Sequence, residues 1–421
     1  RLQALLDYCA AGSLKRGEAK GEVNNHVHTI YSFSPYTPSM AALRAYESGL
    51  DAVGSVDHDS VGAARETLAA GKIIGIATTV GFEVRVSFKS TPFASRKINY
   101  PDSKGNVYMC AHGVPEDALD RAEAWLAPLR KVRIERTRRM AEAAVNRLPS
   151  AGSQQLDFDW HVVPLTKLNE AGGVTEGPVL AAAADLIIAK AGIGAPVVGF
   201  LQDKLSILVP GKLAANLSDP GNPHYRYDLL GFLKTTLIDQ VFIEPDSKEC
   251  PDVREAVAFV RSLGAIPAYA YLGDVGESPT GDKKAETFED SYLDELVAQL
   301  GELGYQAITY MPPRNTVEQL RRVQRLCAKH GLLEISGVDI NSSRQSFNCP
   351  EILQPEFRHL NESTWALIAH EKLAARQPEL AFFHPENPLA GLDLKQRTVA
   401  YAKSGRTMDP RSPSLIATPR A

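Results

Sequence analysis

Cysteines and long hydrophobic runs are scarce in this sequence, and each shortage excludes a class of protein. The five cysteines are scattered, odd in number and never spaced as C-x-x-C, which argues against a disulfide framework or a zinc ribbon. The most apolar stretch, residues 177–201, contains Asp185 and Lys190, so we expect a buried helical pair there and no membrane span. The first residues lack the apolar core of a signal peptide. We therefore expect a reduced, cytoplasmic protein.

Neither sign of charge dominates. The formal net charge is -4, from 46 basic and 50 acidic residues, which gives no general attraction to a nucleic-acid duplex or an anionic membrane. An acidic substrate stays open, because bound metal ions supply positive charge that a side-chain count misses. With 421 residues, 44% of them hydrophobic, the chain can bury a large core and form more than one compact unit. The sequence leaves the oligomeric state open.

Short apolar runs alternate with helical patterns in two separate parts of the chain. We expect strands over residues 51–57, 72–79, 240–244, 265–271, 307–310 and 332–338. We expect helices over residues 41–48, 61–70, 252–263, 292–303 and 316–330. Strands and helices that alternate at these lengths predict parallel βαβ units, and hence an α/β sheet or barrel.

A region of different texture separates the two parts. We divide the chain into a lead-in (1–21), a first barrel part (22–115), a helical insertion (116–235), a second barrel part (236–348) and a C-terminal extension (349–421) with a poorly ordered end. The insertion begins with a charged helix near residues 129–148. Glu135 lies within its basic run, Arg130 to Arg139, so we expect a solvated helix face there and no anion-binding patch.

Polar residues gather where the predicted strands end. His26 and His28 lie two apart in an extended segment, so both imidazoles can reach one ion, although two histidines on a half-exposed strand would give the same pattern. Asp57 and His58 end the strand DAVGSVD, where the alternative is the N-terminal cap of the next helix.

Further strand ends carry the same residue types: Glu83 in GFEV, His112 after VYMCA, and Asp339 with Asn341 in GVDIN. Active sites of α/β barrels form at the carboxyl ends of the strands. Taken together, these positions predict a metal site more specifically than any one of them alone.

The order HVHT, SVDHDSVGA, GFEV and GVDIN resembles the PHP (polymerase and histidinol phosphatase) superfamily, and the insertion and GYQAITYMPPRN resemble its TrpH-like phosphoesterases. The resemblance covers most of residues 22–345. It implies a distorted (β/α)7 barrel with a helical insertion, and two or three divalent ions (Zn, Mn or Fe) that serve the hydrolysis of phosphate esters. We expect two ions.

The resemblance also implies roles for particular residues. The implied ligands are His26, His28, Glu83, His112 and Asp339, with Asp57 and His58 near a further ion or the substrate phosphate. Four positions depart from the family pattern: Tyr271 and Asn341 replace histidines, Val179 replaces another, and residues 311–315 read MPPRN. Asn341 could still bind an ion through its amide oxygen, and Asp274 or His384 could compensate.

We therefore expect a metal-dependent hydrolase acting on a small phosphorylated substrate, a phosphomonoester or small nucleotide. Asp57 or His58 would bind the phosphate or protonate the leaving oxygen. Arg85, Arg96, Lys97 and Arg314 could hold substrate charge, or could be ordinary surface residues. The competing hypothesis is a degenerate PHP protein that binds a metal or ligand without turnover. A P-loop-like run at residues 276–283 has Asp282 in place of the lysine, and we expect a solvated loop there.

Overall fold

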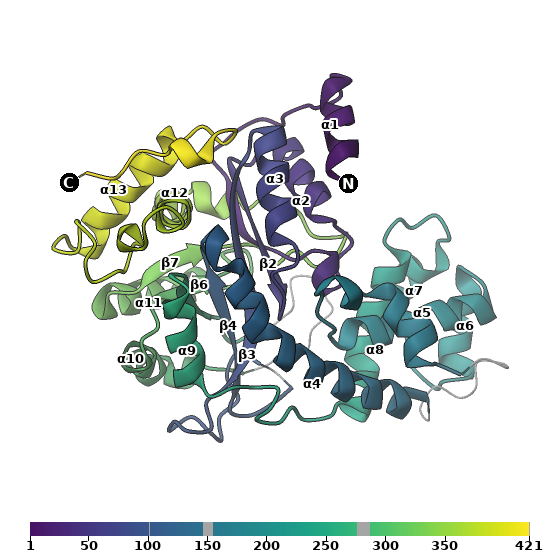
Figure 1. Cartoon of the computed structure of the whole chain (residues 1–421). Coiled ribbons are helices and arrows are strands. Elements are labelled where there is room, and N and C mark those ends of the chain that lie inside the picture. Colours follow the sequence, from purple (N-terminus) through teal and green to yellow (C-terminus); the bar gives the residue numbers. More distant parts are fainter. Residues whose placement is uncertain (101, 146–154, 276–286, 421) are drawn as a thin grey trace.

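A seven-stranded mixed sheet curls into a nearly closed barrel in the computed structural model (Figure 1), which describes residues 1–100, 102–145, 155–275 and 287–420. The strands lie side by side in chain order: β1 (Val23–Val27), β2 (Ala52–His58), β3 (Ala77–Ser87), β4 (Asn106–His112), β5 (Ile266–Ala270), β6 (Ala307–Tyr310) and β7 (Leu333–Ser336). Ile340, beyond β7, closes the ring on β1, because its N–H donates to the His26 carbonyl (3.1 Å) and its carbonyl accepts from the His28 N–H (3.0 Å). The predicted distorted barrel is confirmed.

One strand breaks the predicted parallel order. Strand β4 runs antiparallel to both β3 and β5, whereas the other neighbouring pairs are parallel. Glu83 on β3 is therefore paired with Cys110 on β4, and His112 lies farther down the barrel, opposite Ile266. The carboxyl end of β4 thus lies at the opposite end of the barrel from the carboxyl ends of the other strands.

Helices on the outside of the barrel follow the strands: α2 (Pro38–Glu47), α3 (Ala64–Ile74), α9 (Val253–Ser262), α10 (Leu293–Leu303) and α11 (Val317–His330). Helix α11 shows how local sequence sets such an element. Thr316 and Gln319 form a capping box at its start, and Gly331, in the left-handed region at φ 67°, ends it. Leu320 and Cys327 recur at helical spacing and are buried on the barrel side.

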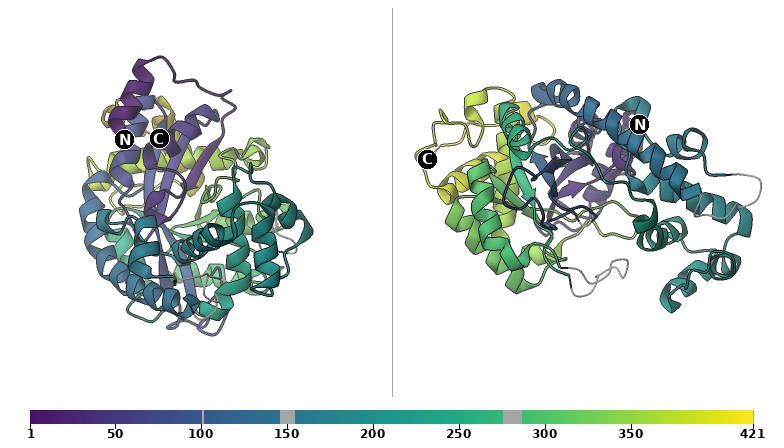
Figure 2. Two further views of the ribbon diagram at one scale, coloured as in Figure 1. Left: turned by 90° about the vertical axis from the view of Figure 1, so that its right-hand side faces the viewer. Right: turned by 90° about the horizontal axis from the view of Figure 1, so that it is seen from below.

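The insertion between β4 and β5 stands beside the barrel (Figures 1 and 2). It consists of α4 (Leu119–Val145), α5 (Glu176–Ala191), α6 (Ala195–Asp203), α7 (Gly211–Ser218) and α8 (Tyr225–Val241). Helix α4 joins the two parts, because Leu126 packs in the barrel core and Met140 in a core of the insertion. No single helix among the described residues is long and apolar enough to cross a membrane; only the pair α5 and α6, bent by 105°, meets that length and composition together.

The C-terminal extension packs against the barrel through α12 (Arg358–Ala374), which α13 (Leu394–Thr407) covers, while α1 (Leu2–Ala10) lies on α3. Thr364 of α12 accepts a hydrogen bond from the Asn25 side chain at 2.7 Å. The end of this extension, which we expected to be poorly ordered, contacts the rest of the chain: Ile416 is buried, and the Arg411 guanidinium donates to the Ile73 carbonyl at 2.6 Å. These contacts lie far apart in sequence, so the polar, proline-rich composition gave no sign of them.

Most predicted elements are confirmed, with two corrections. The strand predicted over residues 240–244 was wrong, because α8 continues to Val241. The strand predicted over residues 72–79 begins too early, since α3 runs to Ile74 and Gly75, at φ 87°, separates it from β3. Both stretches are short apolar runs, which fit a buried helix face as well as a buried strand. The P-loop-like run at residues 276–283 lies outside the described residues.

Short turns complete the described secondary structure: η1 (Ile30–Ser32), η2 (Glu116–Ala118), the π-turn η3 (Phe158–Val162), η4 (Val163–Leu165), η5 (Leu168–Glu170), η6 (Asp290–Tyr292), η7 (Pro350–Leu353), η8 (Pro378–Leu380) and η9 (Pro413–Leu415).

Candidate metal centre

The end of β1 brings two imidazoles together. The Nε2 atoms of His26 and His28 lie 3.2 Å apart, and both side chains are buried. The other ring nitrogen of His28, Nδ1, lies 3.1 Å from Ser32 Oγ in η1. Because the Ser32 hydroxyl donates its single hydrogen to Asp57, its oxygen accepts from His28 Nδ1. Nε2 is therefore the His28 nitrogen that faces the other potential ligands.

Asp57 lies behind this pair. Its carboxylate is buried and accepts hydrogen bonds from the Thr29 N–H and the Thr29 hydroxyl, both at 2.7 Å, as well as from Ser32. Asp57 belongs to none of the ligand groups that the described residues form. Its position is that of a residue that orients a metal-binding histidine through an intervening hydroxyl.

Carboxylates from β3 and from the segment after β7 face the same histidines. Glu83 Oε2 lies 3.0 Å from His58 Nδ1 and 3.9 Å from His28 Nε2, and Asp339 Oδ1 lies 3.2 Å from His28 Nε2. The rings of His28 and His58 stack with centroids 4.6 Å apart. Two groups of potential ligands result: His28, His58 and Glu83, and His26, His28 and Asp339.

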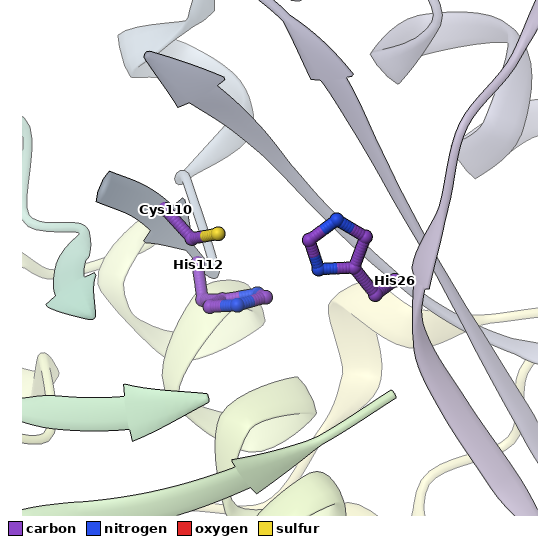
Figure 3. Close-up of side chains that lie close together, drawn as sticks. All are labelled: His26, Cys110 and His112. Carbon is purple, nitrogen blue, oxygen red and sulfur yellow. The ribbon is translucent and has the colours of Figure 1, made fainter. Parts of the chain in front are cut away.

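A third group lies deeper and includes Cys110, which the strand-end motifs did not predict. His26, Cys110 and His112 have ligand atoms within 4.8 Å of one another, and Figure 3 shows both β4 side chains pointing toward His26. Cys110 and His112 are two apart on β4, so they share a face of the strand, as an H-x-H pair does. That same-face spacing was the signal available in the sequence.

The charges in this cluster set its protonation. Burial lowers the pKa of His112 to about 3, so its ring is neutral. Burial also disfavours the charged form of Glu83, but the charge and hydrogen bond of His58 outweigh it and lower the pKa of Glu83 to about 2. For His28, burial acts to lower the pKa, yet the hydrogen bond and charge of Asp339 raise it to about 9. The His28 nitrogen and the Asp339 oxygen thus hold a proton between them, a position that suits a cation.

Beside the cluster lies a network of buried arginines. Glu249, 1% exposed, accepts from Arg133 Nε (2.9 Å) and Arg136 Nε (2.7 Å), and its carboxylate lies 2.9 Å from Arg85. Arg133 also pairs with Asp59, which follows His58 and has a φ of 49°. The expected solvated face of α4 was therefore wrong for these residues. Their acidic partners come from the residue after β2 and from the segment before α9, and an isolated helical pattern contains no such information.

The remaining predicted residues lie outside the ligand groups. Asn341 is exposed and its amide donates to Asp339 at 2.9 Å. The Tyr271 hydroxyl donates to Asp290 at 2.6 Å, and Asp274 accepts from the Phe288 N–H.

The other candidates occupy separate places. His384 accepts from the Glu386 N–H in the C-terminal extension, and Val179 packs in a core of the insertion. The substrate candidates Arg96, Lys97 and Arg314 contact Tyr292, Phe288 and the Leu272 carbonyl, respectively.

The barrel has counterparts among solved structures. It is similar to an amidohydrolase from Chromobacterium violaceum, solved with bound sulfate and no metal, at a TM-score of 0.51 and 19% identity over 81% of this chain and 96% of that one. It also aligns with a protein from Bifidobacterium adolescentis proposed to be a metal-dependent phosphoesterase, at a TM-score of 0.48 and 19% identity over 80% and 96% of the two chains. No family model and no curated protein matches the sequence. At 19% identity the likeness to the C. violaceum protein shows the fold alone.

Proposed function

We propose that this chain is a metal-dependent hydrolase of phosphate esters, acting on a phosphomonoester or a small nucleotide with two divalent ions, Zn, Mn or Fe. The observation that carries the proposal is the convergence of imidazoles and carboxylates from several strand ends on one part of the barrel interior. Nitrogen and oxygen donors in this combination are suited to all three ions. When bound, such ions lower the pKa of a coordinated water and polarise a phosphoryl oxygen.

The chain's own residues would have separate tasks. His28, Glu83 and His58 would hold an ion, with Asp339 beside His28, and Asp57 would orient His28 through Ser32. His58 and Asp339 are the exposed edge of the cluster, with 21% and 31% of their side chains accessible against 2% for His28. Substrate would therefore approach over that edge, and His58 is better placed than Asp57 to meet its phosphate.

The choice of phosphate esters depends on the PHP resemblance of the strand-end motifs. The C. violaceum protein is called an amidohydrolase and was solved with bound sulfate, an oxyanion similar in shape to phosphate. The bond that is cleaved is therefore part of the test, with amide and phosphate ester substrates assayed together. Arg96 and Arg314 stay our candidates for substrate charge, whereas Arg85 has carboxylate partners in Glu249 and Glu176.

A second candidate is a protein that binds an ion or ligand without turnover. This candidate is supported by Tyr271 and Asn341, two positions at which the chain departs from the PHP pattern. Tyr271 uses its hydroxyl on Asp290, and the Asn341 amide donates to Asp339, so neither joins a ligand group among the described residues.

Hydrolysis of a panel of phosphomonoesters, nucleotides and amides, after loading with each metal, separates the two candidates. We expect phosphate ester turnover that His28→Ala and Glu83→Ala abolish and that His161→Ala, a change on the insertion, leaves intact. Absence of turnover with every metal, despite tight ion binding, would favour the second candidate, as would turnover that does not depend on His28 or Glu83. Selective turnover of amides would refute the choice of bond.

A further inference from the structure

The three residues of the deep group combine two nitrogen donors and one sulfur. Cys110 and His112 project from the antiparallel strand β4, and His26 projects from β1 across the barrel (Figure 3). Cys110 is fully buried and His112 is 1% exposed. The group thus lies deeper in the barrel than His58 and Asp339, which form the exposed edge of the whole ligand cluster.

One buried nitrogen of this group lacks a hydrogen-bond partner among the described residues. His112 Nε2 is completely enclosed and makes no hydrogen bond with any described residue. An unsatisfied buried nitrogen destabilises the fold, and a bound cation would give it a partner. The Cys110 sulfur has Glu83 Oε1 as a neighbour, at 3.8 Å.

The dimensions suit a tetrahedral ion. With bonds of about 2.0–2.3 Å, the nitrogen and sulfur ligands of zinc lie about 3.3–3.6 Å apart. The ligand atoms of His26, Cys110 and His112 are within 4.8 Å of one another, so an adjustment of about 1 Å at the side chains completes the site. Glu83 is placed to supply the fourth ligand, because Oε1 faces Cys110 while Oε2 faces His58.

The distribution of histidines also separates two ions. His28 has one lone pair available, since its Nδ1 is used on Ser32, so it serves only one ion. If His26 joins Cys110 and His112, then His28, His58 and Glu83 form the second group, and the two groups share no histidine. The two oxygens of Glu83 then connect them.

We propose that His26, Cys110 and His112 form a deep nitrogen–sulfur site that binds a thiophilic divalent ion, Zn²⁺, through the Cys110 thiolate. When the zinc–sulfur bond forms, the thiol proton passes to solvent, so no oxidant or reductant is needed. This proposal rests on the proposed function, because the ion at the deep site is one of the two ions proposed for the cluster. Its occupation nevertheless does not require turnover. Thiolate donors select zinc over manganese, so the deep and outer positions differ in metal preference.

Titration of the metal-depleted full chain with Co²⁺ tests the site without any assay of hydrolysis. We expect a near-ultraviolet sulfur-to-cobalt charge-transfer band that Cys110→Ser removes and that Cys327→Ser, at an equally buried thiol outside the site, retains. Zinc bound per chain should fall from two ions to one in the Cys110→Ser protein only. A band that persists in Cys110→Ser, or no band in the wild type, would overturn the proposal.

Zinc-edge X-ray absorption on the wild-type protein provides an independent measurement in case Cys110→Ser fails to fold. One sulfur neighbour at about 2.3 Å per two zinc ions is expected, and a shell of nitrogen and oxygen alone would overturn the site. Sulfur ligation without turnover of any phosphate ester would leave this site standing and refute the proposed function. Turnover of a phosphate ester without sulfur ligation would support the proposed function and refute the deep site.

Discussion

Replacement of Glu249 by glutamine removes one negative charge from the centre of the buried arginine network. The carboxylate is 1% exposed and lies within 3 Å of the guanidinium groups of Arg85, Arg133 and Arg136, which hold its pKa below the usual range against the effect of burial. Glutamine keeps one acceptor oxygen but leaves buried positive charge uncompensated. Losing one partner of a buried ion pair costs about 3–5 kcal/mol, and we expect Glu249→Gln to lower the free energy of unfolding by that amount.

Urea denaturation followed by circular dichroism measures this change. Asp159→Asn is the matched control. Asp159 pairs at 2.6 and 2.8 Å with Arg138, which lies on α4 like Arg133 and Arg136, but this pair is exposed to solvent. Solvent screens that pair, so its loss should change stability far less than Glu249→Gln does. Equal midpoints for the two variants would show that the buried network does not stabilise the junction of barrel and insertion.

Three further predictions concern other parts of the chain. Burial raises the pKa of Glu289 to about 7, so its ionisation lowers the free energy of unfolding as the pH rises from about 4.5 to 7. Glutamine does not ionise, so the stability of Glu289→Gln should rise by about 3 kcal/mol relative to the wild type across that range. If the two proteins showed the same change in stability with pH, the prediction would be refuted. Asp57→Asn should weaken zinc binding by about 10–100-fold with the fold preserved, since Asp57 orients the Thr29 turn behind the histidines, and an unchanged dissociation constant in a calorimetric titration would contradict that role. Gly405→Ala would place a methyl group 2.2 Å from the Trp365 carbonyl between α13 and α12, so its melting temperature should fall by several degrees, and an unaltered value would show that the two helices can separate without cost.

The sequence predicted those elements whose determinants are local. The capping box of Thr316 and Gln319 and the spacing of Leu320 and Cys327 define α11 without reference to the rest of the chain. The strand-end motifs likewise predicted that His28 and Glu83 would meet, because carboxyl ends of parallel strands gather at one end of a barrel.

What could not be predicted depends on pairings between distant segments. The sequence places Cys110 on the same strand face as His112, but Cys110 is paired with Glu83 only through the antiparallel register of β3 and β4, and the alternation of residues does not reveal a strand's direction. The burial of Arg133 and Arg136 likewise depends on Glu249, which lies more than a hundred residues away in the sequence. The composition of this segment indicates a basic helix whether its arginines are buried or exposed, and only the packing decides whether they face water.

The central claim is that the converging residues hold two divalent ions, and the most direct test is the metal content per chain of protein purified without chelator or added metal. Elemental analysis should find two ions per wild-type chain, drawn from Zn, Mn and Fe, and fewer in Glu83→Gln, because Glu83 faces both ligand groups. One ion or none in the wild type, with the protein folded, would contradict the account.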